Sequence, residues 1–593
     1  MNLRRIGNVV AVIAILVAMG FGIAYLLLND KVQDTIERSV AAYLKDRVEH
    51  DMQDLDSTIS VGIGALRYGF FTQHLEIDSI TILDLDGDTV TGRMMHIVIP
   101  SVTCTGVAWW DVLFGDGLSL GTITIDSPVV TYINRTLEIG KRTSTHDDDT
   151  TRFRLPSLPN VDSVLQVLMI RHLPLKVRPL NIAGIRISDA TFYNRGRDSL
   201  ASYDGSFMGI SLDVEDISMG TVGGRPIGHF MLEVDSIQRV YADGRFIRAQ
   251  GMRFDIGEQD TSFVVDTVSY DSPVGNRYYA DGVRFSYPGR SIAIDSFRLR
   301  PGKSDADFFA ARNVRTDRFE VAGSHLKFTE IDIPALSRGE QLHVRKIAVG
   351  RLDLDILSNK VPPPSRRAKP PLMPYQLMRS VPFSMNIDTI QLKHASITYS
   401  EKHPNSFRYA TLFWSGTRAT ISGISNDPAR QRRQPVVVDA SGQFMNRARM
   451  WLTCTMPMNV DRHELDAVGG MHGMDATVLA GFLTIAENIG LQSGRTGEAR
   501  FRFSVRGRAS RGTVDVEYHD LKLQMVDKKT KKSTGLFDKV ASWLANWLVI
   551  RNDNVPGDRY KTGVIDYTLP RDAAIMQTLW FPLRDGLGDV IGF

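Results

Sequence analysis

Two short stretches of the sequence hold residues of the types that bind metals or phosphates. The acidic run at 84–88, DLDGD, resembles the start of a calcium-binding loop, but no glutamate completes that loop at the required spacing. Asp-Gly is a leading dipeptide of hairpin turns, so a turn is the better prediction there. The run at 115–121, GDGLSLG, resembles a phosphate-binding loop. A strand pattern follows it, however, where a helix would have to supply the amide groups.

Two histidines, His463 and His472, flank carboxylates and a Gly-Gly pair, an arrangement that could bind a metal but that better fits a polar loop. The motifs G-x-x-x-x-G-K-[ST], H-E-x-x-H and C-x-x-C are absent from the sequence, and G-x-S-x-G occurs only as GLSLG at 117–121, within the run that precedes a strand pattern. We therefore expect no catalytic, cofactor-binding or metal-binding residues. The sequence predicts that the protein is not an enzyme.

A strand phrase, I-x-I-x-x-[AP]-x-φ with φ apolar, recurs along the chain and is the most distinctive feature of the sequence. It begins at Ile123, Ile185 and Ile390, and looser copies begin at Ile80 and Ile347. Five copies in similar surroundings predict a repeated supersecondary unit. The leading apolar positions of the copies are Ile80, Ile82, Ile123, Ile125, Ile185, Ile187, Ile347, Val349, Ile390 and Leu392.

From Ser60 to about Lys360, apolar and polar residues alternate within short stretches. This pattern predicts short strands that form an antiparallel meander. Two polar breaks, 141–156 and 359–374, interrupt the strands. Each break precedes a short helical pattern, at 161–173 and 375–381, and then a copy of the phrase. Residues 60 to 570 could form roughly 25 strands. At about 4.8 Å per strand, a sheet of that many strands would be about 120 Å long.

The first apolar segment, Gly7–Leu28, carries no charge over 22 residues and would span about 33 Å as a helix. Arg4 and Arg5 precede it, so we expect the N-terminus to stay in the cytoplasm and the rest of the chain to lie outside. The alternative is a cleavable signal peptide, although no clear cleavage site follows. The next segment, Asp30–Asp51, has the apolar spacing of a charged helix.

Towards the C-terminus, 474–507 reads as a short helix followed by strands, 512–526 as two further strands, and 573–593 as a partly helical apolar segment. The helical pattern at 534–550 contains Trp543 and Trp547, which predict either a helix at a membrane interface or an ordinary core face. We divide the chain into 1–29 (anchor), 30–140, 141–360, 361–460 and 461–593.

Composition narrows the function further. The formal net charge of +3 over 593 residues is too close to neutral to indicate a nucleic-acid partner. The only two cysteines, Cys104 and Cys454, either pair or remain as buried thiols. Asp-Ser/Thr-aliphatic triplets recur, as at Asp78, Asp235 and Asp266. They resemble an O-glycosylation signal of some Gram-negative bacteria, but they also suit turns at strand edges, which we favour.

The anchor, the repeated phrase and the segment 479–507 together resemble the AsmA family of the Gram-negative envelope. The resemblance covers most of the chain and is weakest over 181–360. It implies a mostly β protein, with an N-terminal transmembrane helix followed by an elongated, twisted antiparallel β-groove and a few short helices. It further implies kinship with chorein-type bridge-like lipid transfer proteins, single-pass anchoring in the inner membrane through residues 7–28, and a periplasmic body.

The function that the resemblance implies is binding of phospholipid in the groove and its conduction towards the outer membrane, in support of outer-membrane integrity. The ten apolar phrase positions would line the groove, and an outer-membrane or periplasmic protein partner is expected because the estimated length is short. A non-transporting envelope scaffold or assembly factor with the same fold is the alternative. An enzyme such as a glycan hydrolase would need two facing carboxylates, which nothing in the sequence marks.

Overall fold

The described part of this computed structural model is mostly β-sheet. It comprises residues 37–39, 41, 42, 45, 59–69, 72–85, 93–106, 118–134, 180–197, 201–219, 227–257, 260–273, 275–337, 341–363, 372–404, 406–487, 489–525, 551–571 and 573–592. These residues contain 25 strands of one mixed sheet and a few short helices. They form two compact units, one up to Val268 and one from Ser269 onwards. The prediction of a mostly β protein is confirmed.

In the first unit, short strands join end to end into longer interrupted strands. β1 pairs with β4, β4 with β5 and β5 with β8, while β2 pairs with β3, β3 with β6 and β6 with β7. Both β7 and β8 then pair with the single long strand β9, which is followed by β10, β11 and β12. The strands are β1 (Ile59–Ile63), β2 (Leu66–Gly69), β3 (His74–Ile77), β4 (Ile80–Leu85), β5 (Arg93–Ile99), β6 (Ser101–Cys104), β7 (Leu118–Asp126), β8 (Val129–Asn134), β9 (Leu180–Arg197), β10 (Ser202–Met219), β11 (His229–Tyr241) and β12 (Phe246–Ile256).

The unit boundary lies within β13 (Thr261–Asp271). In the second unit each strand from β14 to β24 pairs with the next one along the chain. The strands are β14 (Asn276–Ser286), β15 (Ser291–Pro301), β16 (Thr316–Ile331), β17 (Gln341–Asn359), β18 (Ser384–Lys402), β19 (Ala410–Ser425), β20 (Val436–Phe444), β21 (Ala448–Met456), β22 (Glu464–Met471), β23 (Ile489–Arg506), β24 (Ala509–Met525) and β25 (Gly563–Thr568).

The expected antiparallel meander is wrong at two places. β9 runs parallel to β7 and β8, and β18 runs parallel to β17. A parallel pair needs a crossover connection of about a dozen residues or more, and both connections, 135–179 and 360–383, are longer than that. These are the same two breaks that the sequence places before a helical pattern and a copy of the phrase. The break therefore marks a change of strand direction.

The helices are short and are placed by local signals. Asp427 accepts a hydrogen bond from the Ala429 amide and Pro428 opens the first turn of α8, while Gly592 ends α11 at φ 100°. The predicted helices at 375–381, within 474–507 and within 573–593 are present. The helices are α5 (Asp305–Ala310), α6 (Ile333–Ser337), α7 (Pro374–Ser380), α8 (Pro428–Arg433), the 3-10 helix η1 (Ala476–Leu479), α9 (Ala480–Glu487) and α11 (Ile575–Ile591).

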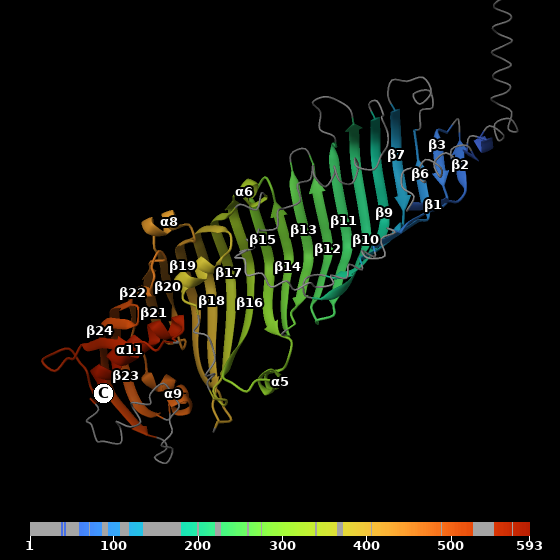
Figure 1. Cartoon of the computed structure of the whole chain (residues 1–593). Coiled ribbons are helices and arrows are strands. Elements are labelled where there is room, and N and C mark those ends of the chain that lie inside the picture. Colours follow the sequence, from blue (N-terminus) through green and yellow to red (C-terminus); the bar gives the residue numbers. More distant parts are fainter. Residues whose placement is uncertain are drawn as a thin grey trace, which may run out of the picture. The chain divides into compact units, whose positions relative to one another are not determined.

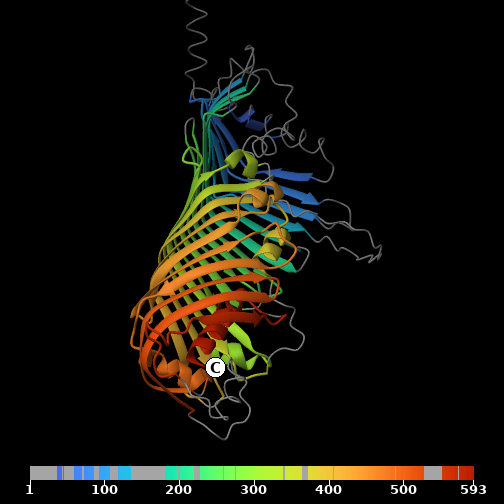
Figure 2. The same ribbon diagram turned by 90° about the vertical axis from the view of Figure 1, so that its left-hand side faces the viewer.

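The densest core of the second unit lies where α11 packs on its last strands. Figures 1 and 2 show the strands of this part bending around α11, which lies on their concave side. Phe581 of α11 packs on Phe503 of β23 and Ile565 of β25, which are 2% and 1% exposed. A second cluster, around Val590 and Tyr518, joins the end of α11 to β24.

Several predicted segments lie outside the described residues. They are the anchor Gly7–Leu28, the helical pattern at 161–173, and the helix with Trp543 and Trp547. Among the described residues, no helix has the length and apolar character needed to cross a membrane. Of the helix predicted over Asp30–Asp51, residues 37–39, 41, 42 and 45 are described and are helical.

Candidate functional site: an apolar sheet face

The phrase residues of the first unit lie in continuous apolar rows that run from strand to strand. We name each row after its residue in β9. The 185 row and the 187 row are two residues apart in every strand and therefore share one face of the sheet. The 185 row contains Tyr68, Leu75, Cys104, Ile123, Ile185, Val214, Phe230 and Ile256. The 187 row contains Leu66, Ile77, Val102, Ile125, Ile187, Leu212, Leu232 and Phe254.

A third row, the 192 row, lies five residues away from the 187 row in each long strand. In a regular strand, residues five apart face opposite sides of the sheet. Residues with positive φ interrupt several strands between the two rows, such as Ser127, Asp189 and Gly251. One inserted residue reverses the alternation, so that both rows face the same side. The 192 row contains Val61, Ile82, Ile97, Val130, Phe192, Phe207, Ile237 and Ala249.

This insertion explains the repeated phrase. The first and third positions of the phrase lie before the inserted residue. The Ala or Pro and the last apolar residue of the phrase lie after it. Asp126-Ser127-Pro128 is therefore an interruption within a long strand, since both β7 and β8 pair with β9. The copy at Ile80 is not equivalent to the others. Ile82 lies in the 192 row, and Ile80 pairs with Ile63 and Ile99 beside it.

Three of the interruptions share one construction, a glycine with positive φ beneath an aspartate of the next strand. The pairs are Gly209 with Asp235, Gly251 with Asp266, and Gly282 with Asp295. A Cβ atom on these glycines would come within 2.2, 2.1 and 2.1 Å of the Oδ2 atom of the aspartate. All three aspartates lie in the middle of strands, so the predicted strand-edge turns are wrong for Asp235 and Asp266.

The second unit carries the remaining candidates in two rows of the same kind. We name them after their residues in β17. The 347 row contains Phe285, Ile292, Phe328, Ile347, Ile390, Ile421, Val438, Cys454, Ala467 and Phe503. The 349 row contains Ile294, Leu326, Val349, Leu392, Ala419, Ala440 and Leu452. The structure thus places nine of the ten candidates in these rows, five in the first unit and four in the second, while Ile80 lies beside the 192 row between Ile63 and Ile99.

The 347 row shows which side of the second unit is apolar and how far it is covered. Its last members, Cys454, Ala467 and Phe503, are at most 4% exposed and belong to the core that α11 covers. Ile347 is 9% exposed because α6 packs near it through Ile333. Most other members of these rows are only half-buried. The apolar face is therefore the concave face, and among the described residues only its C-terminal end carries a complete second layer.

The opposite face is polar and forms ion pairs between and along strands. Arg186 lies between Ile185 and Ile187 in β9 and pairs with Asp213 of β10 at 3.0 Å. Arg284 donates to Asp295 at 2.7 Å, and this hydrogen bond lowers the pKa of Asp295. Charge on this face and apolar residues on the other give the alternation that the sequence displays.

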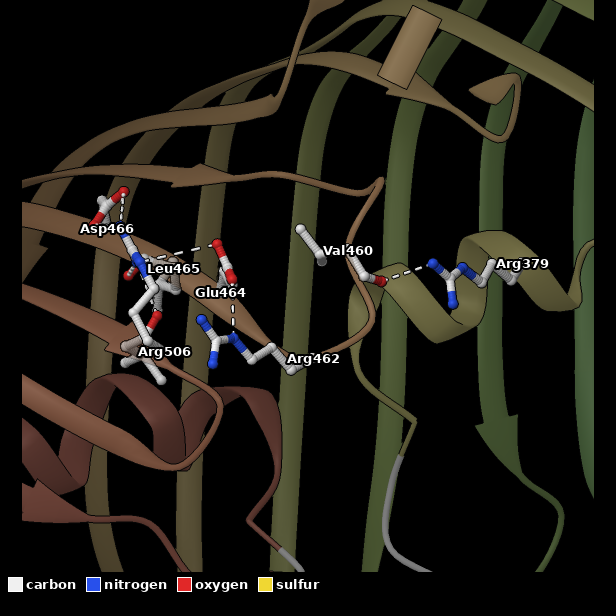
Figure 3. Close-up of polar contacts among 8 residues, drawn as sticks. Arg379, Val460, Arg462, Glu464, Leu465, Asp466 and Arg506 are labelled. Carbon is white, nitrogen blue, oxygen red and sulfur yellow. Dashed lines mark hydrogen bonds and ion pairs between the residues drawn. The ribbon is translucent and has the colours of Figure 1, made fainter. Parts of the chain in front are cut away.

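A polar network continues along β22 and β23 to the crossover that precedes β18. Figure 3 shows Arg506 directed at Asp466, with a closest distance of 2.8 Å, and Arg462 directed at Glu464 at 3.2 Å. Arg379 of α7 donates to the carbonyl oxygen of Val460 at 2.7 Å. The crossover between the parallel strands β17 and β18 is thereby fixed to the connection between β21 and β22.

The predicted polar loop between His463 and His472 is instead strand β22. Leu465 and Ala467 alternate within it and are 1% and 0% exposed, because both pack into the core beneath α11. Burial lowers the pKa of His463, while His472 is exposed. Among the residues that the structure describes, no group of three His, Cys, Asp or Glu side chains could hold a metal ion.

Both cysteines are free thiols, so of the two alternatives the structure has the unpaired one. Cys104 lies in the 185 row of the first unit and Cys454 in the 347 row of the second. Burial raises the pKa of both thiols, that of Cys454 to about 11. Thiols of this kind are inert packing residues.

One buried polar cluster was not predicted. The side chain of Glu401 is 4% exposed, accepts a hydrogen bond from the Tyr399 hydroxyl at 2.6 Å, and lies 2.8 Å from His403 Nε2 and 3.5 Å from Lys360 Nζ. Burial alone would raise the pKa of Glu401, but these partners together lower it. The alternation of Tyr399, Glu401 and His403 in the sequence was the available signal. The cluster joins the end of β18 to the residue that follows β17.

Comparison with known proteins leaves the family open. No protein-family model matches the chain, and no curated protein matches it. The resemblance to the AsmA family therefore stays a prediction.

Proposed function

We propose that this is an AsmA-like protein, anchored in the inner membrane through residues 7–28, whose apolar face binds phospholipid acyl chains and conducts them towards the outer membrane. The observation that carries the proposal is the set of apolar rows that cross up to ten consecutive strands while most members remain half-buried. A contiguous apolar surface of this extent usually marks a binding site.

The rows suit acyl chains for a physical reason. Burying each methylene group is worth about 0.8 kcal/mol, so an apolar face that a protein layer leaves open gains stability from an acyl chain. Because neighbouring strands present equivalent apolar residues, a chain moving from strand to strand keeps that gain. Movement along such a face needs no catalytic group.

The remaining parts of the proposal rest on the sequence. The uncharged segment Gly7–Leu28 and the preceding arginines support a single-pass anchor with a periplasmic body. An outer-membrane or periplasmic protein partner would receive the lipid where the sheet ends. The elongated β-groove itself, as an open apolar-lined path for lipid, belongs to the proposal.

The first experiment asks whether lipid occupies the apolar face. A photocrosslinking residue is placed at Ile125 or Ile187, with Thr124 as the matched control, since Thr124 neighbours Ile125 but faces Arg186 on the polar side. We expect phospholipid adducts by mass spectrometry at Ile125 and Ile187 and far fewer at Thr124. Absence of adducts, with no phospholipid in native mass spectra of the purified full-length protein, would refute lipid binding.

The second experiment separates transport from a scaffold function. Ile125→Asp places a charge on the apolar face, whereas Thr124→Asp places the same charge beside Arg186 on the other face. We expect Ile125→Asp to impair outer-membrane integrity at normal protein levels and Thr124→Asp to leave it intact. If both variants fold and support the envelope equally, the scaffold alternative is correct.

A further inference from the structure

Trp451 breaks the pattern of the polar face in the second unit. It is 41% exposed and alternates with Leu452 of the 349 row, so it lies on the side away from the apolar face. Its direct neighbours across the strands are Ser441 of β20 and Gly470 of β22. A Cβ atom on Gly470 would come within 2.9 Å of Trp451 Nε1, so the missing side chain is what lets the indole lie across β22.

A cavity of about 610 Å³ opens beside this indole. Its polar-face lining comes from four neighbouring strands, and the 349-row residues between them supply its floor. The polar-face residues are Gln391, Lys393, His394, Arg418, Thr420, Asp439, Ser441, Trp451 and Thr453. The volume lies in the range of small-molecule sites, about 300–1,000 Å³.

Three cations of this cavity lack the acidic partner that two arginines on the same face have. Arg351 of β17 pairs with Asp353 at 2.9 Å and Arg500 of β23 with Glu498 at 2.7 Å. Across the described part of the chain, no carboxylate forms an ion pair with Lys393, His394 or Arg418.

The local backbone explains why these cations gather. The pairing of β18 with β19 shifts register on either side of Ala395, and Gly416 opposite adopts φ 56°. This interruption places Lys393 and His394 next to each other at the cavity. The one carboxylate in the lining, Asp439, accepts a hydrogen bond from Thr453 at 2.7 Å.

We propose that this cavity binds an anionic saccharide, a sugar that bears a phosphate or carboxylate group. An exposed indole offers an apolar face for the C–H side of a sugar ring together with an N–H donor. Thr420, Ser441 and Asp439 supply hydrogen-bonding groups for ring hydroxyls. Arg418 and Lys393 supply the charge that an anionic substituent needs. The recognition groups come from the polar face, so the inference does not rest on the lipid proposal.

The test is calorimetric titration of the purified full-length protein with glucose 1-phosphate and trigalacturonate, with maltotriose as the neutral match and inorganic phosphate as the anion alone. We expect both anionic sugars to bind saturably and at least tenfold more tightly than maltotriose or phosphate. Trp451→Ala and Arg418→Ala should each weaken binding at least tenfold. Trp580→Ala, which removes an equally exposed tryptophan on α11, and Arg449→Ala should not.

Three outcomes would overturn the proposal. The first is no saturable binding of either anionic sugar, and the second is equal binding by inorganic phosphate, which would indicate a general anion site. The third is tighter, Trp451-dependent binding of a short single-stranded oligonucleotide, which would assign a different ligand. Trp451→Phe distinguishes lost recognition from misfolding, because it keeps an aromatic ring and should retain most of the affinity at an unchanged melting temperature.

Discussion

The second unit contains two regions built from the same strand pattern but packed differently. In β22, β23 and β25 the apolar residues meet α11, and Leu465, Val505 and Ile565 are at most 1% exposed. In β18–β20 the equivalent residues, such as Ile390, Leu392 and Ala419, are half-buried. The first region is a folded core, while the second has an apolar surface that remains available. Coverage, and not strand sequence, separates the core from the candidate site.

The largest loss of stability should come from truncating a covered apolar residue, and the comparison is with the same truncation at an uncovered one. We expect Phe503→Ala to lower the free energy of unfolding by about 3–5 kcal/mol, because it leaves a cavity beneath α11. Leu392→Ala, on the uncovered part, should cost about 1 kcal/mol because this side chain is only partly removed from water and no second layer closes over the space left by the truncation. Urea denaturation measures both, and equal losses would contradict the comparison.

The uncovered region has a buried polar cluster of its own, whose loss should rank second. Glu401→Gln should cost about 3 kcal/mol at pH 7, because it leaves Lys360 and His403 without their buried anion. The pKa of Glu401 is lowered in the folded state, so its contribution is present above the unfolded pKa, about 4.3, and lost as the pH falls through the folded value.

The pH dependence supplies the control for that prediction. The difference in urea midpoint between the wild type and Glu401→Gln should be constant from about pH 5 to pH 7 and should shrink below about pH 4. A difference that stays unchanged at low pH would show that Glu401 acts through packing alone.

A smaller effect should follow from the interruptions that keep the apolar rows on one face. Gly282→Ala should cost about 2–3 kcal/mol, since it adds the strain of positive φ to a clash with Asp295. Gly416→Ala has the same kind of backbone angle but open space around it, so about 1 kcal/mol is expected. Asp295→Ala should remove much of the difference in a double mutant, measured by the same denaturation assay.

The smallest effect should come from the polar face. Arg351 and Asp353 form an ion pair at 2.9 Å with side chains that are 68% and 41% exposed. Such pairs contribute little in water, so Arg351→Ala should change the free energy of unfolding by about 0.5 kcal/mol or less, and by less still in 1 M salt. A loss comparable to that of Leu392→Ala would show that the polar face also carries stability.

Much of the fold could be predicted from the sequence because its signals are local. Alternation of apolar and polar residues marks the strands, and the spacing of the phrase at Ile185 or Ile390 already contains the inserted residue. The helices α7, α9 and α11 also have local signals. The strand at His463–His472 was missed because its two glycines and flanking charges resemble a loop, and only its packing against α11 makes it a strand.

The sequence by itself determined that this chain makes a long series of two-faced strands, with one interruption in each of the phrases at Ile123, Ile185 and Ile390. Alternation and inserted residues act within a single strand and need no partner. Only the tertiary structure decided which apolar residues are covered, where strands run parallel, and that Lys393, Arg418 and Trp451 meet at one cavity. Each of these depends on contacts between strands that lie far apart in the sequence, which local pattern does not specify.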